Sequence, residues 1–164
     1  MLLRIVLFVL LAWPLTVVAQ NIYPNTLTTI NYLDSTIIEK YKRKIDTTRI
    51  TIEPNRVTGM ASFYSAYLNG TLTSTGERYR NKKYTAASNL FKLNTLVRVT
   101  NMHNGATVLV RVNDRMHPNM LKKGRVIDLS VLAAKKIGIA HNGIGIVKVS
   151  VEAIGHSKEN PKNE

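Results

Sequence analysis

The chain has 164 residues, 45% of them apolar, so it can bury the core of one ordinary domain, and a wholly disordered chain is excluded. Its 23 lysine and arginine residues against 10 acidic residues give a formal net charge of +13, which predicts a polyanionic partner: nucleic acid, anionic lipid or a carboxylate-bearing polymer. Because cysteine is absent, we expect no disulfide, no thiolate metal site, no cysteine nucleophile and no lipid anchor on an N-terminal cysteine.

Residues 1–19 are predicted to be a secretory signal peptide, cleaved before Gln20. They carry one positive charge at Arg4, then an apolar run, and end in a V-x-A pattern. The alternative is an uncleaved membrane anchor, but Pro14 interrupts the run before it reaches the roughly 20 apolar residues that a span needs. Cleavage removes Arg4 and lowers the net charge from +13 to +12. Export argues against a nucleic-acid partner, and we expect no stable membrane anchor.

Three further segments follow in the predicted mature chain. Residues 20–57 are predicted to be a linker or N-terminal extension, with a short basic helix over Thr36–Ile45. The alternative is one or two strands packed on the domain, because Arg49–Ile52 alternates. Residues 58–155 contain short strands separated by turn signals, and residues 156–164 form a polar tail.

The segment Leu96–Asn113 is predicted to form a β-hairpin. Two alternating runs flank the dipeptide Asn104-Gly105, which favours a two-residue type I′ turn. Such a loop places Val99 opposite Val110.

The same register brings two arginines together across the hairpin. Arg98 falls opposite Arg111, and like charges in that position are unfavourable unless an anion lies between them. The alternative is that both guanidinium groups turn into water. The candidate anions are a ligand carboxylate, Glu77, Asp114 and Asp128.

A second unit follows the hairpin. Val126–Leu129 is predicted to be a short buried strand, after which Ser130 caps a helix over Val131–Ile137 that ends at Gly138. Ile146–Ile154 alternates and is predicted to be a closing strand. The pattern indicates a mainly β domain, a small closed barrel with one short inserted helix.

Carboxylates are the strongest candidates for chemistry. The sequence contains no G-x-S-x-G motif, no phosphate loop and no histidine spacing typical of zinc, so we expect neither metal nor cofactor. Two carboxylates at loop edges suit the cleavage of a glycosidic bond. The alternatives are that Asp114 pairs with Arg115 or Arg111, that Glu77 is a surface acid, and that Asp128 either caps the helix or projects into a cleft.

Five stretches, in order, resemble the rare lipoprotein A (RlpA) family. Its domain is a six-stranded double-psi β-barrel related to that of the expansins. The stretches are GMASFYS at 59–65, NGTLTSTGERY at 69–79, YTAAS at 84–88, LNTLVRVTNMHNGATVLVRVNDR at 93–115 and GRVIDLSVLAAKKIG at 124–138.

The resemblance implies an endolytic peptidoglycan transglycosylase, exported to the periplasm or cell surface, that acts on glycan strands without a cofactor. By the family's pattern Asp114 is the acid and then the base, and Glu77 stabilises the oxocarbenium ion or orients the substrate. Cell-division partners stay unspecified. The residues expected to contact substrate are Phe63, Tyr64, Ser88, Arg98, Arg111, Asn113, Arg115 and Asp128.

The sequence departs from the family's pattern at three places. Ser88 stands where a histidine is usual, and Met116-His117-Pro118 follows Asp114-Arg115 where Gly-Pro is usual. Phe63-Tyr64-Ser65 replaces W-Y-G and keeps two aromatic rings that can stack on a sugar. The departures leave two alternatives open: a non-catalytic, expansin-like glycan-binding module, and a basic domain that binds a protein or a membrane.

Overall fold

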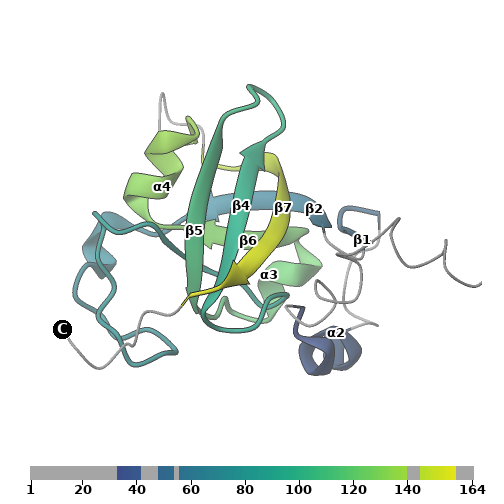
Figure 1. Ribbon diagram of the computed structural model, residues 1–164, viewed down its shortest axis with the longest axis horizontal. Coiled ribbons are helices and arrows are strands. Elements are labelled where there is room, and N and C mark those ends of the chain that lie inside the picture. Colours follow the sequence, from purple (N-terminus) through teal and green to yellow (C-terminus); the bar gives the residue numbers. More distant parts are fainter. Residues whose placement is uncertain (1–32, 42–47, 54–55, 140–144, 158–164) are drawn as a thin grey trace, which may run out of the picture.

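The computed structural model describes residues 33–41, 48–53, 56–139 and 145–157 (Figure 1). The predicted signal peptide therefore lies outside the described residues, as does most of the polar tail. None of the described helices is long and apolar enough to cross a membrane. The elements are α2 (Ser35–Tyr41), β1 (Thr51–Glu53), β2 (Arg56–Phe63), η2 (Ala66–Leu68), β3 (Thr85–Ala87), β4 (Thr95–Asn101), β5 (Thr107–Asp114), α3 (Asn119–Lys122), β6 (Arg125–Leu129), α4 (Val131–Lys136) and β7 (Val147–His156).

Six strands close into a barrel. The order along the sheet is β2-β6-β3-β5-β4-β7, and β7 pairs back onto β2, while β1 is an added strand on β2. The pairs β2–β6 and β3–β5 are parallel, and the other neighbours are antiparallel. This arrangement confirms the predicted mainly β, six-stranded double-psi barrel with a short inserted helix, α4.

The barrel interior is filled by alternate residues of the strands. On β4 and β7 the valines Val97, Val99, Val149 and Val151 are buried, as their alternation predicts. At Gly59 a Cβ atom would lie 2.4 Å from a methyl group of Val126. A glycine is therefore required where β2 and β6 approach each other.

The predicted hairpin is present as β4 and β5, but its predicted register is wrong by two residues. Val97 and Val99 pair with Val110 and Val108. The Asn101 N–H donates to the Ala106 carbonyl at 2.9 Å, so four residues, 102–105, lie between the last bonded pair. A type I′ turn needs positive φ at both central residues, whereas of this dipeptide only Gly105 is left-handed, at +73°.

The Asn101 side chain fixes the loop through one hydrogen bond within the hairpin and one outside it. The Asn101 side chain accepts a hydrogen bond from the His103 backbone N–H at 2.9 Å and donates one to the carbonyl of Ile137 at 2.8 Å. The hairpin tip is thereby attached to the carboxyl end of α4, and the loop begins two residues earlier than the dipeptide alone indicates.

The corrected register removes the predicted arginine pair. Arg98 lies opposite Leu109 and forms an exposed ion pair with Glu152 at 2.9 Å, whereas Arg111 lies opposite Leu96. Arg98 therefore binds Glu152 rather than a residue of the site described below.

The elements after the hairpin agree with the sequence. The strands β6 and β7 and the helix α4 all form, and the Ser130 hydroxyl accepts a hydrogen bond from the Ala133 N–H at 3.3 Å. Gly138, at φ +77°, follows the end of α4. Since Ser130 is the cap, Asp128 does not have the capping role.

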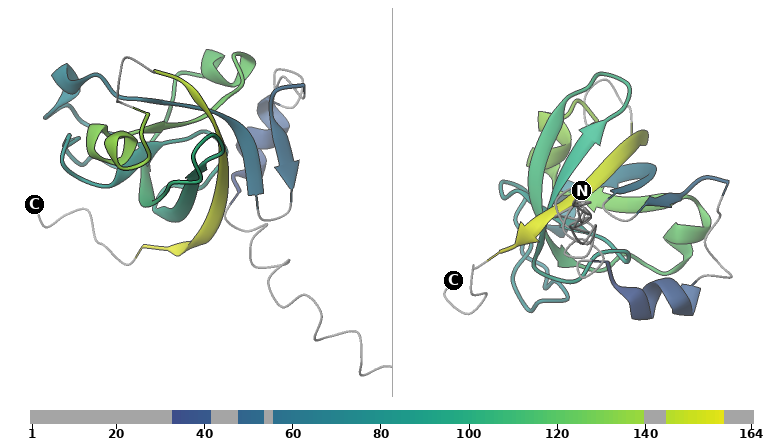
Figure 2. Two further views of the ribbon diagram at one scale, coloured as in Figure 1. Left: turned by 90° about the horizontal axis from the view of Figure 1, so that it is seen from above. Right: turned by 45° about the vertical axis from the view of Figure 1, so that its right-hand side comes forward.

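The described parts of residues 20–57 lie against the barrel rather than apart from it. Leu33, 8% exposed, forms a β-bridge with Phe91, and Ile50 is buried. The strand β1 pairs antiparallel with the start of β2, beside α2 (Figure 2). These parts thus contribute one strand to the sheet and two buried apolar side chains to the core.

Candidate active site

The loop 73–77 contains Glu77 and binds Asp114 through Ser74, so it brings two carboxylates to one edge of the barrel. It is closed by hydrogen bonds from the Thr73 N–H to the Glu77 carbonyl at 2.8 Å and from the Gly76 N–H to the Thr73 carbonyl at 2.9 Å. Gly76 is left-handed, at φ +84°, a conformation that favours glycine. The Thr75 N–H donates to the carbonyl of Asn113 at 3.2 Å, which attaches the loop to the end of β5.

Asp114, the last residue of β5, is held through both carboxylate oxygens. Oδ1 accepts from the Ser74 N–H at 2.9 Å, the Ser74 hydroxyl at 2.7 Å and the Arg115 N–H at 2.8 Å. Oδ2 accepts from the Tyr64 hydroxyl at 2.7 Å. The carboxylate is thus oriented by uncharged donors, and the side chains of Arg111 and Arg115 bind elsewhere.

Tyr64 orients Asp114 from the end of β2. Its ring stacks on Tyr79 with centroids 4.5 Å apart, and the Tyr79 oxygen in turn accepts from the N–H of Val131 at 3.3 Å. Burial and the hydrogen bond to Asp114 raise the pKa of Tyr64 well above its usual range, so its hydroxyl stays a donor. Since Tyr79 covers one face of this ring and Phe63 packs against the core, neither ring has both faces open to a sugar.

Glu77 differs from Asp114 because it is ion-paired. Its two oxygens accept two hydrogen bonds of 2.6 Å from Arg111, and Thr75 and Asn113 donate at 3.0 and 3.5 Å. The side chains of Glu77 and Arg111 are only 11% and 6% exposed. The bonds from Arg111 are the main cause of a lowered Glu77 pKa, so this carboxylate stays ionised at neutral pH.

The structure thus joins Glu77, Arg111 and Asn113 by hydrogen bonds, with Asp114 next to Asn113 in β5 and bonded to Tyr64. The alternatives for Asp114 are wrong, because Arg111 pairs with Glu77 and the Arg115 guanidinium pairs with Asp34 at 2.9 Å. Sequence reasoning missed Ser74, which gives Asp114 two hydrogen bonds. A signal was present, since Ser74 lies in the same short S-T-G-E segment as Glu77.

Two predicted contact residues lie next to this cluster, but their side chains are bonded elsewhere, although the Ser88 N–H donates to the Asp114 carbonyl at 3.1 Å. Ser88 is 0% exposed, donates to the Val126 carbonyl at 2.8 Å and accepts from the Leu90 N–H at 3.2 Å, so it has no surface for a ligand. Asp128 pairs with Arg125 at 3.0 and 2.5 Å. Burial raises the Asp128 pKa despite that pairing, and its charge acts on Tyr64.

The altered loop after Asp114 has a structural role. Met116 is buried, and its backbone N–H and carbonyl both bond the Asn89 side chain, at 3.0 and 2.9 Å. His117 is exposed, and its Nδ1 accepts from the Asn119 N–H at 3.2 Å at the start of α3. This imidazole is therefore occupied away from Asp114 and does not take the place of the family's histidine.

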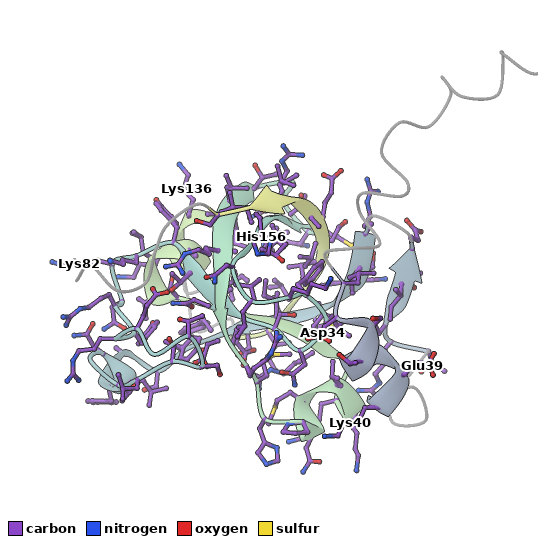
Figure 3. All side chains as sticks on the ribbon, turned by 60° about the horizontal axis from the view of Figure 1, so that its bottom comes forward. Asp34, Glu39, Lys40, Lys82, Lys136 and His156 are labelled. Carbon is purple, nitrogen blue, oxygen red and sulfur yellow. The ribbon has the colours of Figure 1, made fainter. Side chains whose placement is uncertain are left out.

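A cavity of about 450 Å³ has Arg111 in its wall, but neither Glu77 nor Asp114 lines it. This volume is in the range of small-ligand pockets. Lys82 contributes a positive charge to the wall, and the exposed Tyr84 and Leu109 contribute apolar surface. In Figure 3 Lys82 lies at the end of the molecule farthest from Glu39. The remaining lining residues are Lys83, Thr85, Leu96, Val110 and Ser157.

No group of three or more histidine, aspartate or glutamate side chains able to hold a metal ion occurs in the part of the chain that the structure describes. The chemistry available at the barrel edge is that of one carboxylate oriented by uncharged donors beside a second carboxylate kept ionised by an arginine. That combination suits acid–base and electrostatic catalysis.

The fold and the site together define a double-psi β-barrel with a carboxylate pair at one edge. Residues 56–151, more than half of the chain, match the family model described as "Lytic transglycolase", and the chain belongs to this RlpA-like family. The predicted resemblance is thereby confirmed.

Named relatives agree with the family match. The chain is 45% identical over 93 residues to the endolytic peptidoglycan transglycosylase RlpA of Pasteurella multocida, an alignment that covers 57% of this chain and 31% of the relative. It is 47% identical over 94 residues to the RlpA of Pseudomonas aeruginosa, covering 57% and 27%. The chain thus spans less than a third of the length of these relatives. Among solved structures, a Streptomyces papain inhibitor aligns with a TM-score of 0.48 at 21% identity, over 60% of this chain and 94% of that one.

Proposed function

We propose that this protein is an endolytic peptidoglycan transglycosylase that cleaves glycan strands and leaves 1,6-anhydro-muramic acid ends. The observation that carries the proposal is that Glu77 and Asp114, which both contact or belong to the loop 73–77, have different hydrogen-bond partners. Glu77 is locked in an ion pair with Arg111, whereas Asp114 is held only by uncharged donors. Two acids of unlike environment are what glycosidic cleavage needs.

Asp114 supplies the proton in this mechanism. Within the described residues its Oδ1 accepts three hydrogen bonds and its Oδ2 accepts one, so Oδ2 has the freer position for a proton. Protonated Asp114 gives this proton to the glycosidic oxygen as the bond from that oxygen to the muramoyl C1 breaks. The muramoyl C6 hydroxyl then attacks C1, its proton returns to Asp114, and no water is consumed.

Glu77 acts as a fixed anion beside the developing positive charge on the sugar ring. Its lowered pKa makes it unsuited to donate a proton, and the bonds from Arg111 and Asn113 keep it in one orientation. This difference supports Asp114 as acid and base and Glu77 as stabiliser.

The proposed substrate and location agree with the sequence. The relatives are named for action on peptidoglycan, and the predicted signal peptide exports the chain to the periplasm or cell surface. Wall peptides are anionic, and the mature charge of +12 favours their attraction. Binding to the wall should therefore weaken as the salt concentration rises.

The test is mass spectrometry of the soluble products after incubation of the mature protein with purified sacculi, some intact and some stripped of stem peptides. We expect strands that end in 1,6-anhydro-muramic acid, and we expect their release to fall about 100- to 10,000-fold in Asp114→Asn. Glu152→Gln, on the exposed pair with Arg98, is the matched control and should keep full activity. Pelleting with sacculi without any such products would contradict the proposal and favour the non-catalytic, expansin-like binding module.

A further inference from the structure

The guanidinium group of Arg115, the residue after Asp114, is held at three points. Nη1 donates to the carbonyls of Ser88 and Phe91, both at 2.6 Å, and Nη2 donates to Asp34 Oδ2 at 2.9 Å. Burial lowers the pKa of Arg115, and the negative charges of Asp34 and Asp114 oppose that effect. Asp34 is thus the carboxylate in direct contact with this partly buried cation.

Asp34 is itself attached to the segment 90–91, close to the carbonyls that bind Arg115. The Asp34 N–H donates to the Leu90 carbonyl at 2.8 Å, and the neighbouring Leu33 forms a β-bridge with Phe91. The Thr36 hydroxyl donates to Asp34 Oδ1 at 2.6 Å, which leaves Oδ2 directed at Arg115. In Figure 3 Asp34 lies between α2 and the barrel, whereas Glu39 lies at the periphery. The carboxylate is therefore held by contacts that do not involve Arg115.

The backbone of Arg115 connects this anchor to Asp114. Its N–H donates to Asp114 Oδ1 at 2.8 Å and to the Ser74 hydroxyl at 3.2 Å. A side chain fixed at three points limits the rotation of its own peptide group, and that peptide group is one of the donors that orient the carboxylate. Loss of the Asp34 contact should therefore loosen Asp114.

We propose that Asp34 is a positioning residue for Asp114 that acts through Arg115. Asp34 lies outside residues 56–151, which match the family model, so the segment before the barrel contributes to the site. The inference rests on the proposed function where it concerns the rate, but the orientation of Asp114 is measurable without any activity.

The experiment compares Asp34→Ala with Glu152→Ala in the full mature chain. Both changes remove the carboxylate partner of an arginine, but the pair Arg98–Glu152 is exposed and lies away from the site. The first measurement is hydrogen exchange at the backbone N–H of Ser74, which is bonded to Asp114 Oδ1 and lies 40 residues away from Asp34 in sequence. We expect the exchange rate of the Ser74 N–H to rise about 10-fold in Asp34→Ala, because the loop around Asp114 then opens more often. The rate should stay unchanged in Glu152→Ala.

The second measurement is turnover on sacculi. We expect kcat to fall about 10- to 100-fold in Asp34→Ala with KM unchanged, since a small misplacement of an acid acts on the chemical step. Asp34→Glu should restore most of the rate, because it returns the negative charge. A melting curve checks the fold. Should Asp34→Ala fail to fold, Thr36→Ala removes the hydrogen bond that orients Asp34, and it is expected to change exchange and kcat in the same direction to a smaller extent.

Unchanged exchange at Ser74 in every folded variant that disturbs Asp34 would overturn the inference, whatever the activity. Equal loss of kcat in Asp34→Ala and Glu152→Ala would also overturn it, since the effect would then be one of stability. A wild-type protein without activity would contradict the proposed function, but the exchange measurement would still decide whether Asp34 positions Asp114.

Discussion

The Tyr64 hydroxyl donates a hydrogen bond of 2.7 Å to Asp114 Oδ2, across 50 positions of sequence. The two residues follow and end strands β2 and β5, which are separated in the barrel by β6 and β3. The stacking of Tyr64 on Tyr79 keeps the hydroxyl directed at the carboxylate. The proposed acid is therefore oriented by the opposite part of the barrel.

Removal of that hydroxyl should slow catalysis and leave the fold intact. In Tyr64→Phe the ring can still stack on Tyr79, but Asp114 loses the donor at Oδ2. A hydrogen bond to a charged group contributes about 1.5–3 kcal/mol, so we expect a fall in kcat of at least about 10-fold, measured as anhydro-product release from sacculi. Tyr67→Phe, at a residue 97% exposed, is the matched control. Equal rates in the two variants would contradict an orienting role for Tyr64.

Glu77→Gln should destabilise the protein as well as inactivate it. The change leaves Arg111 buried with one neutral acceptor in place of a carboxylate. Loss of one partner of a buried ion pair costs about 3 kcal/mol, a value that urea unfolding at pH 7 measures directly. Glu152→Gln at the exposed pair should cost less than about 1 kcal/mol. Similar costs for the two variants would mean that the pair Glu77–Arg111 is not the buried contact described above.

The contribution of Glu77 to stability should depend on pH. Its pKa in the folded protein lies below the ordinary value of 4.5, so the unfolded chain takes up the proton first as the pH falls. The stabilisation is complete above pH 4.5 and is lost as the pH falls through the lower folded-state pKa. Burial raises the pKa of Asp128, which acts in the opposite sense.

The comparison of wild type with Glu77→Gln cancels the contribution of Asp128. The gap between their free energies of unfolding should narrow from pH 7 toward pH 3, as followed by urea unfolding across that range. A gap that stays constant over this range would contradict the lowered pKa of Glu77.

Introduction of the family's histidine at position 88 should not raise the activity. Ser88 is fully buried and bonds Val126 and Leu90, so the larger imidazole of Ser88→His overpacks the site and costs about 1–3 kcal/mol. Ser88→Ala, which removes only the hydroxyl, should cost about 1 kcal/mol. Thermal melting and product release measure both effects. A Ser88→His variant as stable as wild type and more active would show that the position is open to substrate.

Local patterns in the sequence predicted most of the strands and the helix α4 correctly. Alternation identified β4, β5 and β7, and Ser130 and Gly138 marked the ends of α4, because these signals act between residues a few positions apart. The hairpin register could not be predicted in this way, since it depends on the contact between Asn101 and the carbonyl of Ile137.

The same distinction between local and distant contacts applies to the candidate site. The motifs of the chain by themselves determined its family and pointed to Asp114 and Glu77. Only the tertiary structure decided that Arg111 binds Glu77, that Ser74 and Tyr64 hold Asp114, and that Ser88 is buried. The physical reason is that ion pairing and burial depend on which distant segments meet when the barrel closes, whereas strand and helix signals lie within a single short stretch of chain.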